Sequence, residues 1–116
     1  MREIEKRVIG AFVDGKTKAM GNTKSTRNPK TGDLDLLLYG NCIATMSNRD
    51  GVKKLWVSNA GWSSRTTQSR LNALFSLLNM PERVYIKGGT QYLDSSRYNT
   101  INLSALRKSA VLVAVK

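Results

Sequence analysis

One segment of the chain, residues 57–79, concentrates the side chains best suited to contact an anion or to stack on a planar ring. It reads VSNAGWSSRTTQSRLNALFSLLN and places Trp62, Arg65 and Arg70 among serine and threonine hydroxyls. Those hydroxyls can cap a helix, and a helix N-terminus carries free amides and about half a positive charge. The segment therefore predicts a helix N-terminus that attracts phosphate or carboxylate groups.

The tryptophans of this region have two interpretations. The indole of Trp62, or that of Trp56 shortly before it, could stack on nucleic-acid bases while nearby cations hold the phosphates. Alternatively, Trp62 closes the end of the apolar core and Arg65 pairs with a backbone carbonyl. The sequence leaves both alternatives open.

Positive charge strongly exceeds negative charge in this protein. The chain has 19 lysines and arginines against 8 acids, a net charge of +11 at pH 7. The excess lies in residues 15–32 and 51–81, which contain no acid, and we expect it to gather on one side near the start of the main helix. Such a patch favours a polyanion, nucleic acid first, although a solvated basic surface without a partner is the alternative. The predicted nucleic-acid-binding residues are Lys16, Lys18, Lys24, Arg27, Lys30, Lys53, Lys54, Arg65, Arg70, Trp56 and Trp62.

Residues 10–17, GAFVDGKT, match the phosphate-binding loop pattern GxxxxGK[ST]. That loop follows a strand and opens a helix, so that successive amides surround the phosphates. Here the interior, AFV, favours a strand, and the polar stretch after it does not favour a helix. The match is therefore interpreted as coincidental, with Asp14-Gly15 as a turn.

Other groups give little support for catalysis. The chain has no histidine and a single cysteine, Cys42, so an internal disulfide and the usual zinc sites are excluded. Cys42 is expected to pack as a small apolar residue. Asp33 and Asp35 are expected to be surface acids at a strand start, and Ser63 and Ser64 to be helix caps. We therefore expect no enzyme, no metal and no cofactor.

Apolar periodicity predicts one main helix. Four apolar residues between positions 71 and 78 recur at i, i+3, i+4 and i+7, which predicts a helix over residues 66–79 that ends before Pro81. Residues 104–116 are expected to form a short helix followed by a terminal strand.

Short β-type segments surround the main helix. The predicted strands cover residues 7–13, 34–45, 54–59, 83–87, 91–93 and 98–103. Gly40-Asn41 interrupts the second of them as a bulge or a tight hairpin turn, and residues 16–33 are expected to form a long basic loop or the tip of a loose hairpin. The predicted fold class is α+β, with one antiparallel sheet of about five to six strands packed against the main helix, in a single domain of residues 1–116.

The ends of the chain bear on location and assembly. The first residues, MREIEKR, lack the apolar region of a signal peptide, and the longest apolar runs are too short to span a membrane. We therefore expect a cytoplasmic protein. A terminal strand at residues 111–115 could pair with its copy in a second chain, which predicts a homodimer.

Several stretches of the chain share a pattern. The chain has GNT at residues 21–23, LYGNCIA at 38–44, VSNAGW at 57–62, and TT and RLNAL just after it. These stretches resemble a group of small bacteriophage proteins with a GNT turn, a LYLHGN-IA strand and a GW-S-TT-RLNAL helix start. Gly40 replaces the histidine of that pattern, and the tryptophan that those proteins tend to have between residues 84 and 93 is absent.

The resemblance implies a phage origin, with the host cytoplasm as the site of action, and it implies no catalytic residue. Small basic phage proteins commonly bind nucleic acid or disable a host protein. Our leading hypothesis is a non-enzymatic phage accessory protein that binds DNA or RNA largely independently of sequence. The alternative is an inhibitor that binds a host protein or defence complex, as anti-CRISPR proteins do. The net charge of +11 argues against imitation of DNA.

Overall fold

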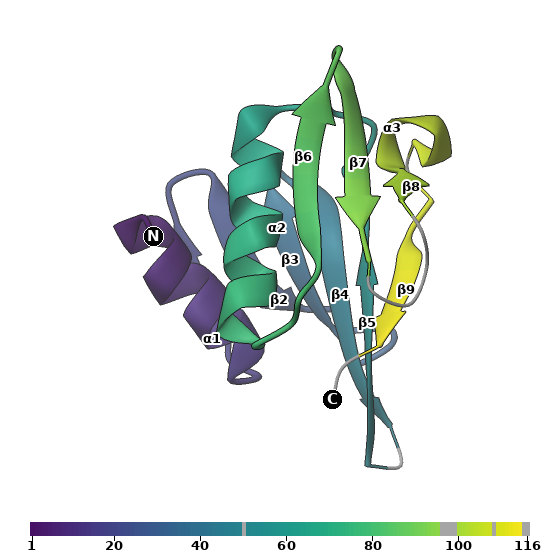
Figure 1. Cartoon of the computed structure of the whole chain (residues 1–116). Coiled ribbons are helices and arrows are strands. Elements are labelled where there is room, and N and C mark those ends of the chain that lie inside the picture. Colours follow the sequence, from purple (N-terminus) through teal and green to yellow (C-terminus); the bar gives the residue numbers. More distant parts are fainter. Residues whose placement is uncertain (50, 96–99, 108, 115–116) are drawn as a thin grey trace.

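The computed structural model describes residues 1–49, 51–95, 100–107 and 109–114, which form two antiparallel sheets and several helical segments (Figure 1). The large sheet has the order β1 (Lys18–Met20), β2 (Thr23–Arg27), β3 (Leu34–Leu38), β4 (Asn41–Arg49), β5 (Val52–Val57) and β9 (Val111–Ala114). The small sheet has the order β6 (Arg83–Lys87), β7 (Thr90–Asp94) and β8 (Ile101–Asn102). The helical segments are η1 (Glu5–Ile9), α1 (Gly10–Val13), α2 (Arg65–Leu77) and α3 (Leu103–Leu106). The predicted α+β class is confirmed.

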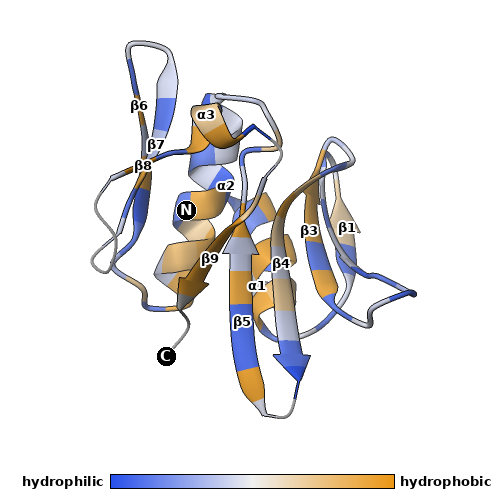
Figure 2. Cartoon of the chain, turned by 90° about the vertical axis from the view of Figure 1, so that its right-hand side faces the viewer, coloured by the Kyte–Doolittle hydropathy of each residue, from blue (hydrophilic) through white to orange (hydrophobic). Residues whose placement is uncertain are grey.

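The main helix lies between the two sheets. Figure 2 shows β6 and β7 on one side of α2 and the large sheet on the other. Leu71, Leu74 and Phe75 of α2 are fully buried, and they belong to one apolar cluster with Leu36 and Leu55 of the large sheet. The predicted helix is thus confirmed, one residue longer at its start and two shorter at its end than expected. The small second sheet was not foreseen as a separate layer.

The N-terminal segment is helical, so the strand predicted at residues 7–13 is wrong. η1 is a π-helical turn that continues directly into α1, which ends at Val13 with Asp14 as its C-cap. Gly15 follows with φ +76°. The buried residues of η1 and α1 are Glu5, Val8, Ile9 and Phe12, which recur at i, i+3, i+4 and i+7, the spacing of one helix face. The β-branched residues of this stretch favoured a strand locally, but packing against α2 decides its conformation.

The basic segment at residues 16–33 is not a long loop. It forms the hairpin of β1 and β2 and a short turn into β3. Thr23 and Ser25 of β2 point to the core and are buried. Buried and exposed side chains therefore alternate along this strand, as in any half-buried strand, but the buried ones carry hydroxyls. Because the buried positions are not apolar, the sequence showed no apolar period from which this strand could be predicted.

A tight turn and a bulge shape the β3–β4 hairpin. Tyr39 and Gly40 have φ of +51° and +78°, as in the two-residue turns that match strand twist. Leu36 pairs with Ala44 but Leu37 pairs with Cys42, so Ile43 is an extra residue in β4. The bulge places Cys42 on the outer face of the sheet, where it is exposed, and the prediction that it packs in the core is wrong.

The remaining elements agree with the predicted pattern of strands and helices. The segments 83–87 and 91–93 form β6 and β7, joined by Gly88-Gly89, and the segment 54–59 corresponds to β5. Of the predicted strand at 98–103, positions 98 and 99 lie outside the described residues, and β8 covers two of the others. The C-terminal segment contains the expected short helix, α3, and strand, β9, while positions 115 and 116 also lie outside the described residues.

Candidate nucleic-acid interface

Arg70 is buried in the interior of the protein. Its side chain is 3% exposed and its Nη1 lies 2.9 Å from Oε2 of Glu5. It also donates from Nε to Oγ1 of Thr23 at 2.9 Å and from Nη2 to Oδ1 of Asn22 at 3.2 Å. The guanidinium therefore joins α2, η1 and the β1–β2 turn, and it is not available to a phosphate.

Arg70 is therefore not part of the interface, and the prediction that it contacts phosphate is wrong. Thr67, Arg70 and Leu74 recur at i, i+3 and i+7 on α2 and are all buried, so Arg70 lies on the buried face of the helix. Burial raises the pKa of Glu5, but hydrogen bonds from Ser69 and Arg70 outweigh it and hold that pKa below its usual range. Both charges are thus paired in the core.

The other eight predicted cations are exposed. Among the described residues, ion pairs join Arg7 to Glu3, Arg49 to Asp33 and Arg70 to Glu5, so none of the eight exposed cations has a carboxylate partner there. These eight are Lys16, Lys18, Lys24, Arg27, Lys30, Lys53, Lys54 and Arg65. Their charges are available to an external anion.

These cations do not gather at one end of the molecule. Lys53 pairs in register with Asn48, at the end of β4 that is farthest from Asn41, roughly 25 Å away at the usual rise per residue of a strand. Arg65 lies beyond the other end of the sheet, at the first position of α2. The expectation of a single patch near the helix start is therefore wrong.

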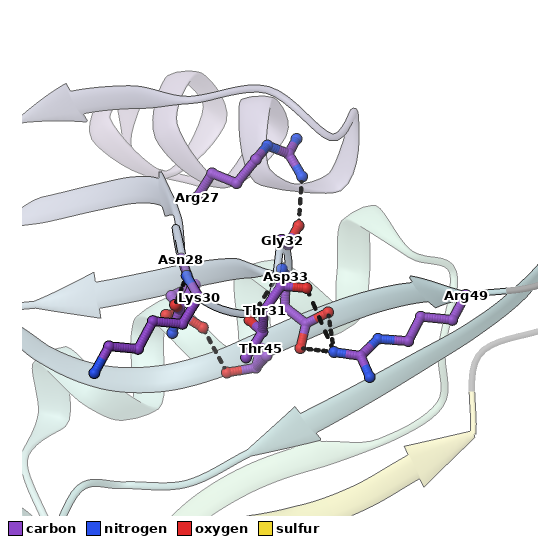
Figure 3. A network of polar contacts seen from close by, with 9 residues as sticks. Arg27, Asn28, Lys30, Thr31, Gly32, Asp33, Thr45 and Arg49 are labelled. Atoms are coloured by element: carbon purple, nitrogen blue, oxygen red, sulfur yellow. Dashed lines mark hydrogen bonds and ion pairs between the residues drawn. The ribbon is translucent and has the colours of Figure 1, made fainter.

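The far end of the sheet is mixed in charge. Arg27 donates to the carbonyl oxygens of Gly32 at 2.8 Å and Gly15 at 3.0 Å. Arg49 lies 3.4 Å from Oδ2 of Asp33 (Figure 3). Asp14 and Asp33 line the same hollow as Arg27 and Arg49. This end is held together by its own contacts, and its acids weaken its attraction for polyanions.

The two tryptophans lie on different surfaces. Trp56 of β5 is half-buried on the outer face of the large sheet, in register with Thr45 and Leu112. Trp62 follows β5 in the loop before α2 and is 64% exposed. The interpretation of Trp62 as a plug of the core is therefore wrong, and its ring is free to contact a ligand.

The loop that carries Trp62 is fixed by its own hydrogen bonds. The amide of Ala60 donates to Oγ of Ser58 at 3.0 Å, and that of Gly61 to Oδ1 of Asn59 at 3.0 Å. Ser64 caps α2 by accepting from the amide of Thr67 at 3.1 Å, as expected. Ser63, also expected to cap the helix, instead bonds with the hydroxyl of Ser104. Helix geometry leaves other amides of this first turn without intrahelical acceptors.

A pocket of about 300 Å³ lies beside this loop. We call it the central pocket. Its wall includes Tyr39 and Asn41 at the β3–β4 turn and Asn59, Trp62 and Ser64 on the loop. Asn59 is 1% exposed, and its Nδ2 has no hydrogen-bond partner within the described part of the chain. The pocket has a largely apolar wall beside the loop that leads into α2.

Two further hollows adjoin the central pocket. Trp62 is shared with a hollow of about 830 Å³ that includes Arg107, and Tyr39 is shared with one of about 480 Å³ that includes Lys24. None of the described Asp or Glu side chains lines any of the three. We call this row the aromatic groove.

The sequence did not single out Tyr39, Asn59 or Arg107 as site residues. Tyr39 stands in a turn position that usually holds Asn, Asp or Gly, and this departure was the available signal. Asn59 and Arg107 carry no such signal, because their positions depend on the meeting of the loop after β5 with the C-terminal segment, where Ser58 donates to the carbonyl of Arg107 at 3.3 Å.

The matches to catalytic patterns do not bring reactive groups together. The order around residues 10–17 is helix, turn and strand, the reverse of the order that a phosphate-binding loop requires. Asp35 accepts from Oγ1 of Thr45 at 2.9 Å, and Asp33 pairs with Arg49. Over the described ranges, no cluster of three or more His, Cys, Asp or Glu side chains is placed to hold a metal ion.

The fold and this surface define a small, basic α+β protein without a recognised catalytic arrangement among its described residues. Comparison with protein families then places it: the model of the family described as Kyanoviridae Gp96 protein matches residues 1–109. The chain belongs to this bacteriophage protein family, in agreement with the phage origin that its motifs imply. Comparisons with curated proteins and with solved structures gave no match. No helix in the described ranges is both long and apolar enough to cross a membrane.

Proposed function

We propose that this phage protein binds DNA or RNA through the phosphate backbone, largely independently of sequence, and is not an enzyme. The observation that carries the proposal is the set of eight exposed cations without carboxylate partners in the described structure. Exposed lysines and arginines on a chain of net charge +11 create a positive potential that attracts polyanions.

The cations differ in how well they suit this role. Lys16, Lys18 and Lys24 lie on or beside the edge hairpin β1–β2, where the side chains point into solvent. Arg65 adds its charge to the N-terminus of α2. By contrast, the far end of the sheet contains Asp14 and Asp33. We therefore assign the main contacts to the β1–β2 edge and the α2 N-terminus.

Fluorescence anisotropy with labelled single-stranded and double-stranded oligonucleotides at two salt concentrations tests the proposal. We expect micromolar or tighter binding at low salt that weakens steeply as salt rises, because bound cations displace counterions. The combined change of Lys16, Lys18 and Lys24 to Gln should weaken binding to every sequence and should make the salt dependence shallower by about three released ions.

A matched control changes Arg2, Lys6 and Arg7 to Gln. It removes the same charge from the N-terminal segment, where Arg7 is already paired with Glu3, so it should affect binding less. Equal effects of the two triple variants would mean that only net charge matters. No binding at low salt would remove the proposal, and capture of a host protein from nuclease-treated lysate would then test the inhibitor alternative.

A further inference from the structure

Two exposed aromatic side chains stand on the rims of the central pocket. Tyr39 is 71% exposed and Trp62 is 64% exposed. Phosphate contacts alone make no use of such rings, whereas bases of a single strand stack on them regardless of sequence. A pocket of about 300 Å³ is at the small end of ligand pockets, a size that suits one base.

The backbone holds both rims in uncommon conformations. Tyr39 has φ +51°, and Ala60, next to Gly61 in the loop of Trp62, has φ +55°. Residues with a Cβ rarely adopt positive φ, and such conformations often occur at binding sites. The loop hydrogen bonds at Ser58 and Asn59 keep this geometry, so the rims are pre-formed.

The charge around the pocket also favours a nucleotide. Arg65 follows Ser64, a residue of the pocket wall, and Lys24 and Arg107 belong to the adjoining hollows. All three are exposed. The aromatic groove thus combines exposed rings with cations, as surfaces that bind single strands do.

We propose that the central pocket binds one unstacked base of a single-stranded DNA or RNA, with Trp62 and Tyr39 as stacking surfaces. The strand follows the aromatic groove, and Lys24, Arg65 and Arg107 contact its phosphates. This inference rests on the proposed function and adds to it a requirement for exposed bases.

Two labelled 15-mers that differ only in their bases test the inference. One is oligothymidylate, and the other carries abasic sites at every position with the same phosphates. Anisotropy at low salt should show at least a roughly ten-fold tighter complex with oligothymidylate, because stacking contributes only there. Trp62→Ala and Tyr39→Ala should each reduce that ratio by weakening the complex with oligothymidylate.

Tyr85→Ala is the matched control, since Tyr85 is another exposed aromatic residue, on β6, outside the groove. It should preserve the ratio. A second measurement uses Trp56→Phe, which leaves Trp62 as the single indole: oligothymidylate should quench its fluorescence and the abasic strand should not. This readout does not depend on removing a pocket residue.

The outcomes separate the two proposals. Equal affinity for the two strands, or an unchanged ratio in Trp62→Ala, would overturn the base pocket and leave phosphate binding in place. If neither strand binds, both proposals fail, and an aromatic side chain of a protein partner becomes the occupant to test.

Discussion

Glu5 and Arg70 form a charged pair in the interior, 65 positions apart in the chain and both about 3% exposed. Ser69 also donates to Glu5, and Thr23 and Asn22 accept hydrogen bonds from Arg70, which completes the network. A buried ion pair adds little net stability compared with apolar residues, but loss of one partner leaves the other charge buried and unpaired. The pair therefore fixes how η1 sits on α2 and on the β1–β2 turn.

Glu5→Gln should lower the free energy of unfolding by about 3 kcal/mol, since Arg70 would lose its counter-charge. Thermal unfolding would then occur roughly 10 °C lower. Glu3→Gln is the control, because its pair with Arg7 is exposed on both sides and should leave the unfolding temperature nearly unchanged. Similar unfolding temperatures for the two variants would contradict the structural role of the buried pair.

The same pair predicts a pH dependence. The pKa of Glu5 is lowered in the folded protein, so the stabilisation is present above the unfolded-state pKa of about 4.3. As the pH falls below that value, the unfolded chain binds the proton first and the stabilisation is progressively lost. Glu5→Gln should lack this component, which denaturant unfolding at pH 3 and pH 6 can measure.

Tyr39 shows a conflict between stability and the proposed binding. Its φ of +51° is unfavourable for a tyrosine, whereas Asn followed by Gly is the preferred pair for such a turn. Tyr39→Asn should therefore raise the free energy of unfolding by about 1 kcal/mol. The same change should weaken binding of oligothymidylate. Gly40→Ala is the control, because Gly40 has φ +78° and an alanine there should destabilise the turn. A Tyr39→Asn protein that is less stable than the wild type would refute the strain argument.

At the scale of elements, β9 leaves one edge of the large sheet open. Among the described strands it pairs with β5 alone, and an unpaired edge can accept the same strand of a second chain. The predicted homodimer remains a prediction. Leu112 lies in β9 and is 44% exposed, so it is accessible for a test.

Sedimentation equilibrium over a range of concentrations tests this assembly. We expect a dimer that Leu112→Lys converts to a monomer, because antiparallel pairing of two β9 strands would bring like charges close together. Leu106→Lys places the same charge on α3, outside the strand, and should leave the dimer intact. A wild-type protein that sediments as a monomer at every concentration would exclude pairing through β9.

At the scale of the whole molecule, charge and shape divide the surface into unlike ends. The far end of the large sheet combines Arg27 and Arg49 with Asp14 and Asp33. The opposite end has exposed aromatics, three hollows and, among the described residues, no carboxylate in their walls. The net charge alone therefore does not locate the interface. The proposed binding surface is the end of the molecule where the walls of the hollows contain no described Asp or Glu side chain.

Local patterns in the sequence were sufficient for the elements whose stability is local. The hydroxyl cap of the main helix, the apolar stripe with Leu71 and Leu74, and the β6–β7 hairpin with its paired glycines all appear as predicted. Each depends on contacts between residues close in the chain: a cap, a helix face or a tight turn. The class of fold followed from them.

The site required contacts between distant residues. The sequence by itself determined the α+β class, the main helix and the excess of positive charge. It also identified Trp62 and Arg65 as candidates for contact with nucleic acid. Tertiary structure decided that Arg70 is buried against Glu5, that residues 7–13 are helical, and that Tyr39, Asn59 and Trp62 share one pocket. The physical reason is that burial and pocket formation depend on which faces meet across the sheet and helix, and local sequence patterns do not contain that information.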